Sequence, residues 1–177
     1  MQSVKLMELH TNKGDKELMK YKDLFENWGL KSLKLNLKFV EAEFVAQPED
    51  QDAAWEMYVE LITRVATQFL EPDAGEEESA LNSVYSLFET TRSILKEKGR
   101  KCESFTKIAV IVLNQVVRPF TAKWHKEKEN GAFNNSEKCI QFRNELAILQ
   151  AELRKYTALL ANIAGVEDIT DINDWRD

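Results

Sequence analysis

The sequence is poor in the residues that form tight turns, since only 6 Gly and 3 Pro occur among 177 residues. A β-sandwich or β-barrel needs many such turns, so this scarcity disfavours both and predicts long helices joined by few loops. With 44% hydrophobic residues, a chain of this length can bury one sizeable core, whereas two domains would each be small. The composition therefore predicts one mainly α-helical domain.

Long apolar runs are also missing. The longest strictly apolar run, residues 108–113, has six residues, whereas a helix that spans a bilayer needs about 20. The first residues, MQSVKLMELH, lack the basic start, the apolar stretch and the small-residue cleavage site of a secretion signal. These absences predict a cytoplasmic protein that does not bind membranes.

Sequence motifs of catalysis and metal binding are absent too. Cys102 and Cys139 are the two cysteines, and neither belongs to a CxxC pair, so both are expected to be buried, reduced thiols. The chain has no Glu-x-x-His motif for a two-metal bundle, no GxSxG elbow and no glycine-rich phosphate loop. The acidic run 76–78 fits the first turn of a helix better than a calcium loop. We therefore expect no cofactor and no metal, and a non-catalytic role is favoured.

Charge is unevenly distributed along the chain, whose formal net charge is −6. Residues 49–99 contain 12 acidic and 4 basic side chains, whereas residues 100–130 contain 7 basic and 3 acidic ones. An acidic protein has no long-range attraction for phosphate backbones, and the basic run 96–101 is too short to form a groove, so we expect no nucleic-acid partner. An acidic pair of helices packed beside a basic helix would explain the pattern.

Residues 1–47 are predicted to form a small β-containing appendage packed on the helical part. Apolar residues alternate over 33–39, which predicts a strand with one wet face, although a helical face through the same region remains an alternative. A lone strand leaves its backbone groups unpaired, and Val4 and Leu6 offer the nearest partner across a short helix at 15–27. The predicted element is therefore β-α-β.

Residues 48–177 are predicted to form an antiparallel four-helix bundle with a docked C-terminal tail, in one domain with the appendage. The expected helices span residues 49–70, 76–99, 101 to a break at 118–119, and a last helix that ends at Gly165. The last helix has a heptad seam with steps of three and four residues: Cys139, Phe142, Leu146, Leu149, Leu153, Tyr156, Leu160 and Ile163. The tail is expected to dock through Val166, Ile169, Ile172 and Trp175.

The stretch 113–125, LNQVVRPFTAKWH, places polar residues at the end of the most apolar helix. Pro119 has no amide hydrogen and crowds the preceding turn, so a kink is expected there. Asn114 and Gln115 would then be buried, and they and Arg118 would need polar partners. Two interpretations stay open: a polar plug that fixes the helix, or a pocket that binds a small anionic ligand or performs acid–base chemistry. The pocket would comprise Glu56, Glu60, Arg64, Asn114, Arg118 and His125.

Three stretches resemble a family of uncharacterised bacterial helical proteins, and the similarity covers most of residues 35–170. The stretches are AAWEMYVELITRVATQ (53–68), ALNSVYSLF (80–88) and VLNQVVRPFTAKWH (112–125). The resemblance implies a helical fold and no particular activity, so no functional residue is taken from it.

The predicted function is that of a non-catalytic accessory protein, which binds a partner protein through a face of the bundle or the appendage, or associates with itself. The chain has more apolar and aromatic positions than one bundle seam requires, and exposed ones would mark a contact surface: Trp28, Leu35, Trp124 and Trp175. The alternative is a bundle that binds a small molecule, or acts as an enzyme, through a polar pocket at the Pro119 kink.

Overall fold

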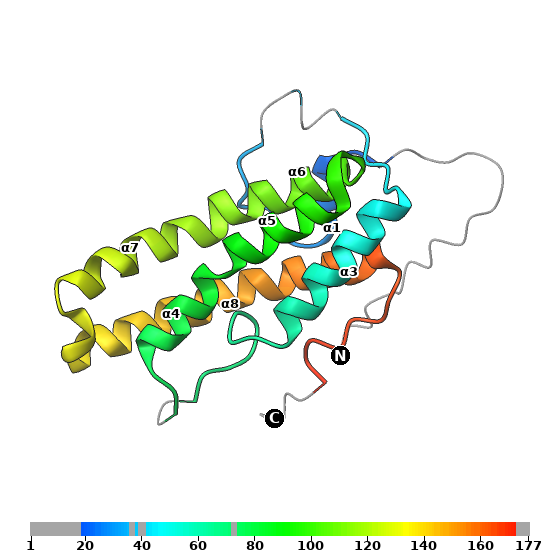
Figure 1. The fold of residues 1–177 in the computed structure, drawn as a ribbon. Coiled ribbons are helices and arrows are strands. Elements are labelled where there is room, and N and C mark those ends of the chain that lie inside the picture. Colours follow the sequence, from blue (N-terminus) through cyan, green and yellow to red (C-terminus); the bar gives the residue numbers. More distant parts are fainter. Residues whose placement is uncertain (1–18, 36–37, 39–41, 72–73, 173–177) are drawn as a thin grey trace, which may run out of the picture.

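The computed structural model describes residues 19–35, 38, 42–71 and 74–172, and this part of the chain is mainly helical (Figure 1). The helices are α1 (Tyr21–Asn27), α3 (Pro48–Ile62), α4 (Glu77–Tyr85), α5 (Leu87–Lys98), α6 (Glu103–Val112), α7 (Arg118–Glu129) and α8 (Ser136–Ala164). A π-helical turn, Leu113–Val117, joins α6 to α7. None of the helices within these ranges is both long enough and apolar enough to cross a bilayer.

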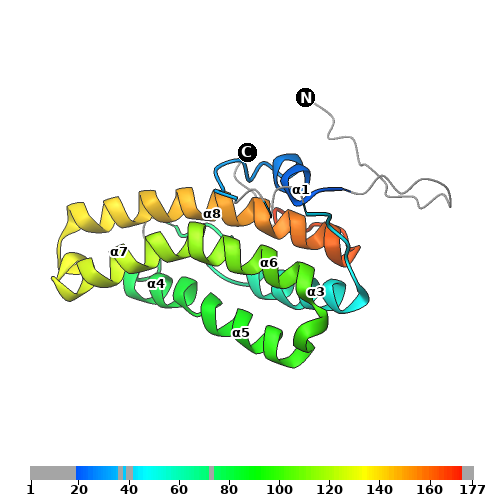
Figure 2. The ribbon, with the colours of Figure 1, turned by 90° about the horizontal axis from the view of Figure 1, so that it is seen from above.

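The longest helix, α8, runs along most of the molecule and contributes much of the core (Figures 1 and 2). Asn135 caps its first turn, because the side-chain oxygen accepts a hydrogen bond of 3.1 Å from the amide of Lys138. Gly165 ends the helix with a left-handed φ of 72°, which glycine adopts without steric cost. The predicted seam is confirmed from Phe142 onward, because these side chains are buried: Phe142, Leu146, Leu149, Leu153, Tyr156, Leu160 and Ile163.

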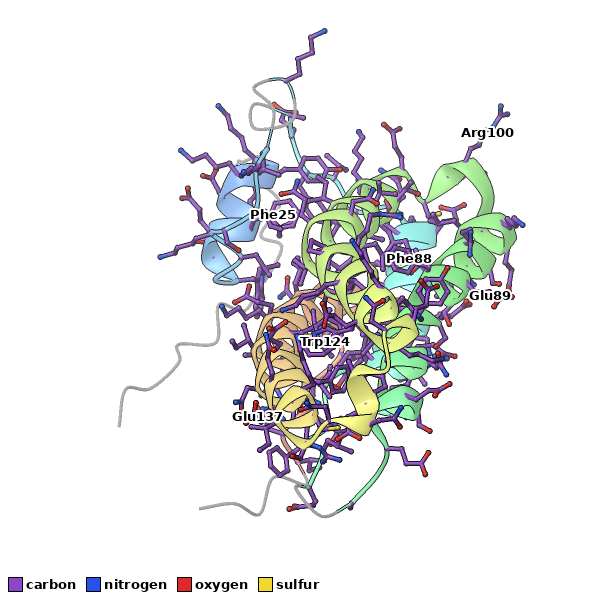
Figure 3. All side chains as sticks on the ribbon, turned by 90° about the vertical axis from the view of Figure 1, so that its left-hand side faces the viewer. Phe25, Phe88, Glu89, Arg100, Trp124 and Glu137 are labelled. Carbon is purple, nitrogen blue, oxygen red and sulfur yellow. The ribbon has the colours of Figure 1, made fainter. Side chains whose placement is uncertain are left out.

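The other helices pack against α8 and against one another. α3 contacts α8, α5 and α6, while α7 contacts α4 and α8. Figure 3 shows Trp124 of α7 in the interior between the helices, with Glu89 and Arg100 on the outside. Trp124 is fully buried, and its Nε1 donates a hydrogen bond of 3.0 Å to Glu145. The sequence had allowed Trp124 to be a surface contact residue, and the structure makes it a core residue instead.

One carboxylate joins the N-termini of α3 and α6. Asp50 is fully buried, and its Oδ2 accepts a hydrogen bond of 2.9 Å from the amide of Gln47, which closes a capping box at the start of α3. Its Oδ1 accepts a second hydrogen bond of 2.8 Å from the amide of Phe105 in the first turn of α6. Helix N-termini carry unpaired amides and a partial positive charge, so this single carboxylate stabilises both ends at once.

α3 ends at Ile62, although the apolar stripe predicted a helix up to about residue 70. Side chains that follow the helix take up its last carbonyl groups. The hydroxyl of Thr67 donates to the carbonyl of Leu61 at 2.6 Å, and the side-chain Nε2 of Gln68 donates to the carbonyl of Ile62 at 3.1 Å. These donors replace the backbone amides of a further helical turn, so the chain can leave the helix while Ala66 stays buried.

The third helical stretch continues through residues 118–119, so the predicted break there is wrong. In the π-turn, the amide of Arg118 donates to the carbonyl of Leu113. Pro119 directly follows this π-turn, and the helix continues past it although its nitrogen has no hydrogen to donate. Asn114 and Arg118 are exposed, so the prediction of polar groups buried beside a kink is also wrong.

Burial along this continuous stretch explains why it contains a π-turn. Buried residues recur at every fourth position: Phe105, Ala109, Leu113, Val117 and Thr121. In an α-helix with about 3.6 residues per turn, each step of four residues drifts by about 40° around the axis. The wider π-turn accommodates an additional residue and takes up this drift. The π-turn thereby helps to keep buried side chains on one side of this long stretch.

The predicted β-containing appendage has no strand within residues 19–35, 38 and 42–47. The amide of Phe44 donates to the carbonyl of Met19 at 2.7 Å, and the amide of Tyr21 donates to the carbonyl of Ala42 at 3.1 Å. These contacts make one isolated bridge between Lys20 and Glu43 rather than a ladder. The remaining predicted features lie outside the described residues: Val4, Leu6, residues 15–18, residues 36–37 and 39 of the strand, and Trp175.

Lys34, the second residue of the predicted strand 33–39, pairs with a side chain of the helical part. Its amide donates to Oε1 of Gln115 at 2.7 Å, and Nε2 of Gln115 donates back to the Lys34 carbonyl at 2.8 Å. Both backbone groups of Lys34 are thereby satisfied without a second strand. Gln115 was predicted to need a polar partner, and this pairing provides one. The side chain lies on the exterior of the π-turn rather than in the core.

The segment after α8 lies against α3 through polar contacts. The hydroxyl of Tyr58 donates to the carbonyl of Glu167 at 3.2 Å and accepts from the amide of Ile169 at 2.8 Å. Thr170 is buried beside these contacts. The apolar side chains that were expected to dock are exposed instead: Val166, Ile169 and Ile172.

Candidate functional site

The structure divides the six predicted site residues between two sides of α5. Glu56 and Glu60 lie on α3, Arg64 follows that helix, and all three line one groove between α3 and α5. Asn114, Arg118 and His125 belong to the α6–α7 stretch, and none of them lines that groove.

The three residues on the α6–α7 side are held by local contacts. Nε of Arg118 donates to Oδ1 of Asn114 at 2.9 Å, and the Arg118 guanidinium lies 4.9 Å from the ring centroid of Phe88. The ring of His125 meets the edge of Tyr85 at 4.8 Å. These contacts hold α7 against α4 and α5. Because Asn114, Arg118 and His125 lie away from the groove that contains Glu56, Glu60 and Arg64, the six predicted residues do not form one site.

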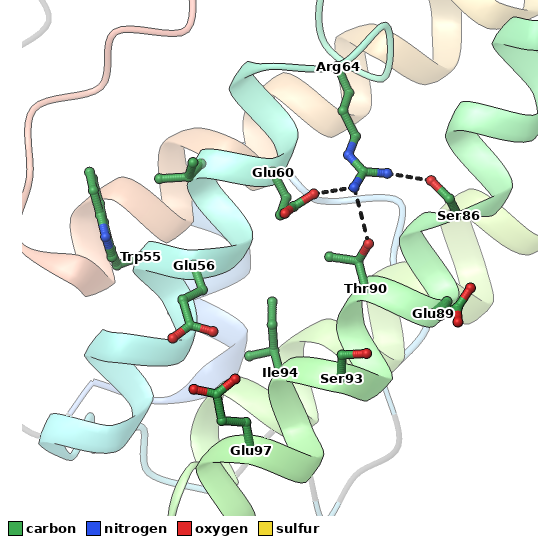
Figure 4. Close-up of a pocket in the computed structure, with 11 residues that line it drawn as sticks. Trp55, Glu56, Glu60, Arg64, Ser86, Glu89, Thr90, Ser93, Ile94 and Glu97 are labelled. Atoms are coloured by element: carbon green, nitrogen blue, oxygen red, sulfur yellow. Dashed lines mark hydrogen bonds and ion pairs between the residues drawn. The ribbon is translucent and has the colours of Figure 1, made fainter.

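The groove between α3 and α5 has a volume of about 600 Å³ and is shown in Figure 4. One wall comes from α3 and its C-terminal turn, with Trp55, Glu56, Val59, Glu60 and Arg64. The other wall comes from α5 and the residue before it, with Ser86, Glu89, Thr90, Ser93, Ile94 and Glu97. The helices run antiparallel, because Glu56 faces Lys98 at one end and Arg64 faces Ser86 at the other.

Short side chains along the α5 wall leave this interface hollow. Ser86, Thr90 and Ser93 stand where larger residues would fill the space between two helices. Val59 and the buried Ile94 provide apolar surface within the groove. The groove therefore combines a small apolar surface from Trp55, Val59 and Ile94 with a lining that is mostly polar and charged.

A polar network closes the groove at the end of α3. The Arg64 guanidinium pairs with the carboxylate of Glu60 and donates to the hydroxyl of Ser86, and it donates to the hydroxyl of Thr90 at 3.3 Å (Figure 4). The Ser86 hydroxyl in turn donates to the carbonyl of Ser83 at 2.7 Å, at the junction between α4 and α5. Arg64 is thus engaged in joining α3 to α5, at the point that divides the predicted helix 76–99 in two.

The opposite end of the groove is acidic. Nζ of Lys98 lies 2.5 Å from Glu56 and 4.0 Å from Glu97. The hydrogen bond to Glu56 raises the pKa of the Lys98 ammonium above its ordinary value. Glu89 and Glu97 are exposed along the α5 edge. Four carboxylates therefore face the groove, against the two cations Arg64 and Lys98.

One large aromatic side chain stands at the rim of the groove. Trp55 is 47% exposed, and its ring stacks on Tyr58 with a centroid distance of 6.0 Å and an interplanar angle of 29°. Tyr58 is itself buried and hydrogen-bonded to the segment after α8, so the Trp55 indole packs on a side chain that is held in place. A rigid, half-exposed tryptophan of this kind can contribute much apolar contact area to a partner.

The groove is lined by carboxylates, hydroxyl groups, one guanidinium and three apolar or aromatic side chains. Its lining contains no cysteine and no histidine. Within residues 19–35, 38, 42–71 and 74–172, no three His, Cys, Asp or Glu side chains are placed to hold a metal ion.

A second, smaller groove of about 370 Å³ lies beside Pro119, between α7 and α8. Its surface is mostly apolar, with Val116, Pro119, Phe120, Ile148 and Leu149 among its lining residues. A pocket at Pro119 was predicted, but none of the six predicted residues lines this one.

Sequence reasoning found part of the α3 wall and missed the α5 wall. Glu89, Ser93 and Glu97 recur at steps of four, which places them on one face of a helix, but this spacing does not reveal which helix they face. No family model, curated protein or solved structure matches the chain. The resemblance to a bacterial family therefore stays a prediction, and the grooves are the features of this molecule that bear on its function.

Proposed function

We propose that this chain is a non-catalytic interaction protein that binds a partner protein through the groove between α3 and α5. The half-exposed Trp55 at the rim of this groove is the observation that carries the proposal. Tryptophan is enriched among the residues that dominate binding energy at protein interfaces. We further propose that the protein acts in the cytoplasm. We also propose that its helices form an antiparallel four-helix bundle, in which α4 with α5 and α6 with α7 each make one of the four helical segments.

The charge of the groove argues against the small anionic ligand that the sequence allowed. Arg64 is its one lining cation, and this side chain is engaged with Glu60, Ser86 and Thr90. An anion would also meet the carboxylates at the α5 edge, which would repel it.

The alternative function is binding of a small amphipathic molecule in the Pro119 groove. The apolar wall of that groove favours it, and Lys123, Glu145 and Glu152 supply polar groups around the wall. The same wall includes Ile148, which is 68% exposed, so one substitution there can separate this alternative from the main proposal.

The test is affinity purification from the native host with mass spectrometry, using the unmodified chain, Trp55→Ala and Ile148→Ala. We expect a defined protein to be retained by the unmodified chain and by Ile148→Ala. Trp55→Ala should weaken its retention, because truncation of a tryptophan that anchors an interface costs about 2 kcal/mol or more, or about 30-fold in affinity. Equal retention by Trp55→Ala, or retention lost only with Ile148→Ala, would contradict the proposal.

A further inference from the structure

The α5 edge of the groove presents negative charge that its surroundings leave available. Glu89 makes no hydrogen bond or ion pair within the described ranges, and Glu97 is 4.0 Å from Lys98, whose closer partner is Glu56 at 2.5 Å. Both side chains are exposed, and Figure 3 shows Glu89 on the outer edge of the molecule. A ligand with positive charge at this edge would therefore gain Glu89 as a partner, and at Glu97 it would compete only with the ion pair of 4.0 Å to Lys98.

The spacing of these carboxylates fits a helical ligand. Glu97 follows Glu89 by eight positions of α5, which corresponds to about 12 Å at 1.5 Å per residue. Two basic residues seven or eight positions apart on a second helix span about the same distance and share one face. From Trp55 to the end of α3 at Ile62, the wall rises over seven positions, or about 10 Å, so this part of the groove accommodates about two helical turns.

The lining of the groove also provides a position for apolar side chains. Val59 and Ile94 are apolar, and the Trp55 ring borders them at one end. Two antiparallel helices with small residues between them form a trough into which the ridge of another helix can pack. An amphipathic helix could direct its apolar residues to this trough and its basic residues to the α5 edge.

We infer that the occupant of the groove is a basic amphipathic helix of a partner protein. Its lysine or arginine side chains pair with Glu89 and Glu97, and an apolar residue of the same helix packs against Trp55 and Val59. This inference rests on the proposed function and adds the chemical class of the partner segment. Nucleic acid and anionic membranes are excluded as occupants by the same carboxylates.

A designed peptide can test the charge requirement without knowledge of the natural partner. The probe is a fluorescein-labelled amphipathic helix of about 14 residues, with lysines at positions separated by seven or eight residues and leucines on the facing stripe. A second peptide has glutamate in place of each lysine. Binding is measured by fluorescence anisotropy at two salt concentrations, because exposed ion pairs weaken as salt rises.

The variant that removes the charge is Glu89→Lys with Glu97→Lys, and the matched control is Glu129→Lys with Glu137→Lys. Both double substitutions change the net charge equally, and all four side chains are exposed. We expect the basic peptide to bind the unmodified chain and the control alike, and to lose affinity by about tenfold or more with the groove variant. Circular dichroism must show the same helix content in all three proteins.

Several outcomes would overturn the inference. They are equal binding of the acidic peptide, equal loss of affinity in the control, and tight binding of spermine to the groove without binding of the peptide. Self-association that the groove variant abolishes would assign the groove to a second copy of this chain, which also contradicts a separate partner. Sedimentation velocity detects that case.

The natural partner separates this inference from the proposed function. If Trp55→Ala weakens capture of the partner and the double substitution of Glu89 and Glu97 does not, the groove is the interface but its occupant is not basic. If neither change affects capture and the basic peptide does not bind, both proposals fail. If both changes weaken capture, both are supported.

Discussion

Replacement of Asp50 tests how this fold is held together at the end where α3 and α6 begin. Alanine at this position removes the acceptor of two backbone amides, those of Gln47 and Phe105. Loss of a helix cap costs about 1 kcal/mol, and a buried amide left without an acceptor costs about 1–3 kcal/mol. The Gln47 amide is partly buried and can bond to water, whereas the Phe105 bond is buried. We therefore expect Asp50→Ala to lower the free energy of unfolding by about 3 kcal/mol.

Asparagine at the same position separates the two bonds. Its side chain has one acceptor oxygen, so Asp50→Asn can satisfy one of the two amides, and we expect about half the loss of Asp50→Ala. The control is Asp52→Asn, because Asp52 is exposed near the start of the same helix and undergoes the same change in charge. We expect this control to change the free energy of unfolding by less than about 0.5 kcal/mol.

Urea denaturation followed by far-ultraviolet circular dichroism measures these differences. In thermal melts, a loss of 3 kcal/mol corresponds to a decrease in Tm of about 6–12 °C for a chain of this size. A loss below about 1 kcal/mol for Asp50→Ala, or an equal loss for Asp52→Asn, would refute the argument that one buried carboxylate serves both helices.

Three other predictions concern local contacts. Burial raises the pKa of Glu145, but hydrogen bonds from three neighbouring side chains outweigh this effect, so its pKa is below 4.5. The stability it contributes is therefore present above about pH 4.5 and is lost on acidification, and Glu145→Gln should flatten the acid limb of a plot of unfolding free energy against pH. Gln115→Ala should speed hydrogen exchange at the Lys34 amide by about fivefold or more, as measured by NMR, because that amide loses its acceptor. Cys102 is buried and burial raises the pKa of Cys139, so both thiols should react slowly with Ellman's reagent until the protein is unfolded. Unchanged acid stability, unchanged exchange or rapid labelling of either thiol in the native protein would contradict these predictions.

Regular periodicity made α8 predictable. Its heptad positions report burial directly, and from Phe142 to Ile163 each of them is buried. The end of α3 was not predictable in the same way, because the apolar stripe continues past Ile62. That end depends on hydrogen bonds from Thr67 and Gln68 to the last carbonyls, and such competition between side chain and backbone leaves no periodic signal.

The candidate site was predictable on one helix only. Glu56 and Glu60 follow one another at a spacing of four, and Arg64 extends the same face, so their common location follows from helix geometry. Their neighbours across the groove depend on how α5 packs against α3, which is a property of the tertiary structure. The expected link to Arg118 failed because a continuous helix leaves that residue on the outer surface.

The π-turn at Leu113–Val117 makes the number of residues in this part of the chain as important as their identity. Deletion of one residue there would close the turn into an ordinary α-helix while α7 keeps its orientation, because the π-turn absorbs one residue more than an α-helical turn. Deletion of one residue within α6 would instead rotate α7 by about 100°, so that Trp124 would leave the interior and Arg118 would lose its contact with Phe88. Relatives of this protein that keep the fold should therefore tolerate loss of one residue within 113–117 far more readily than loss of one residue within α6.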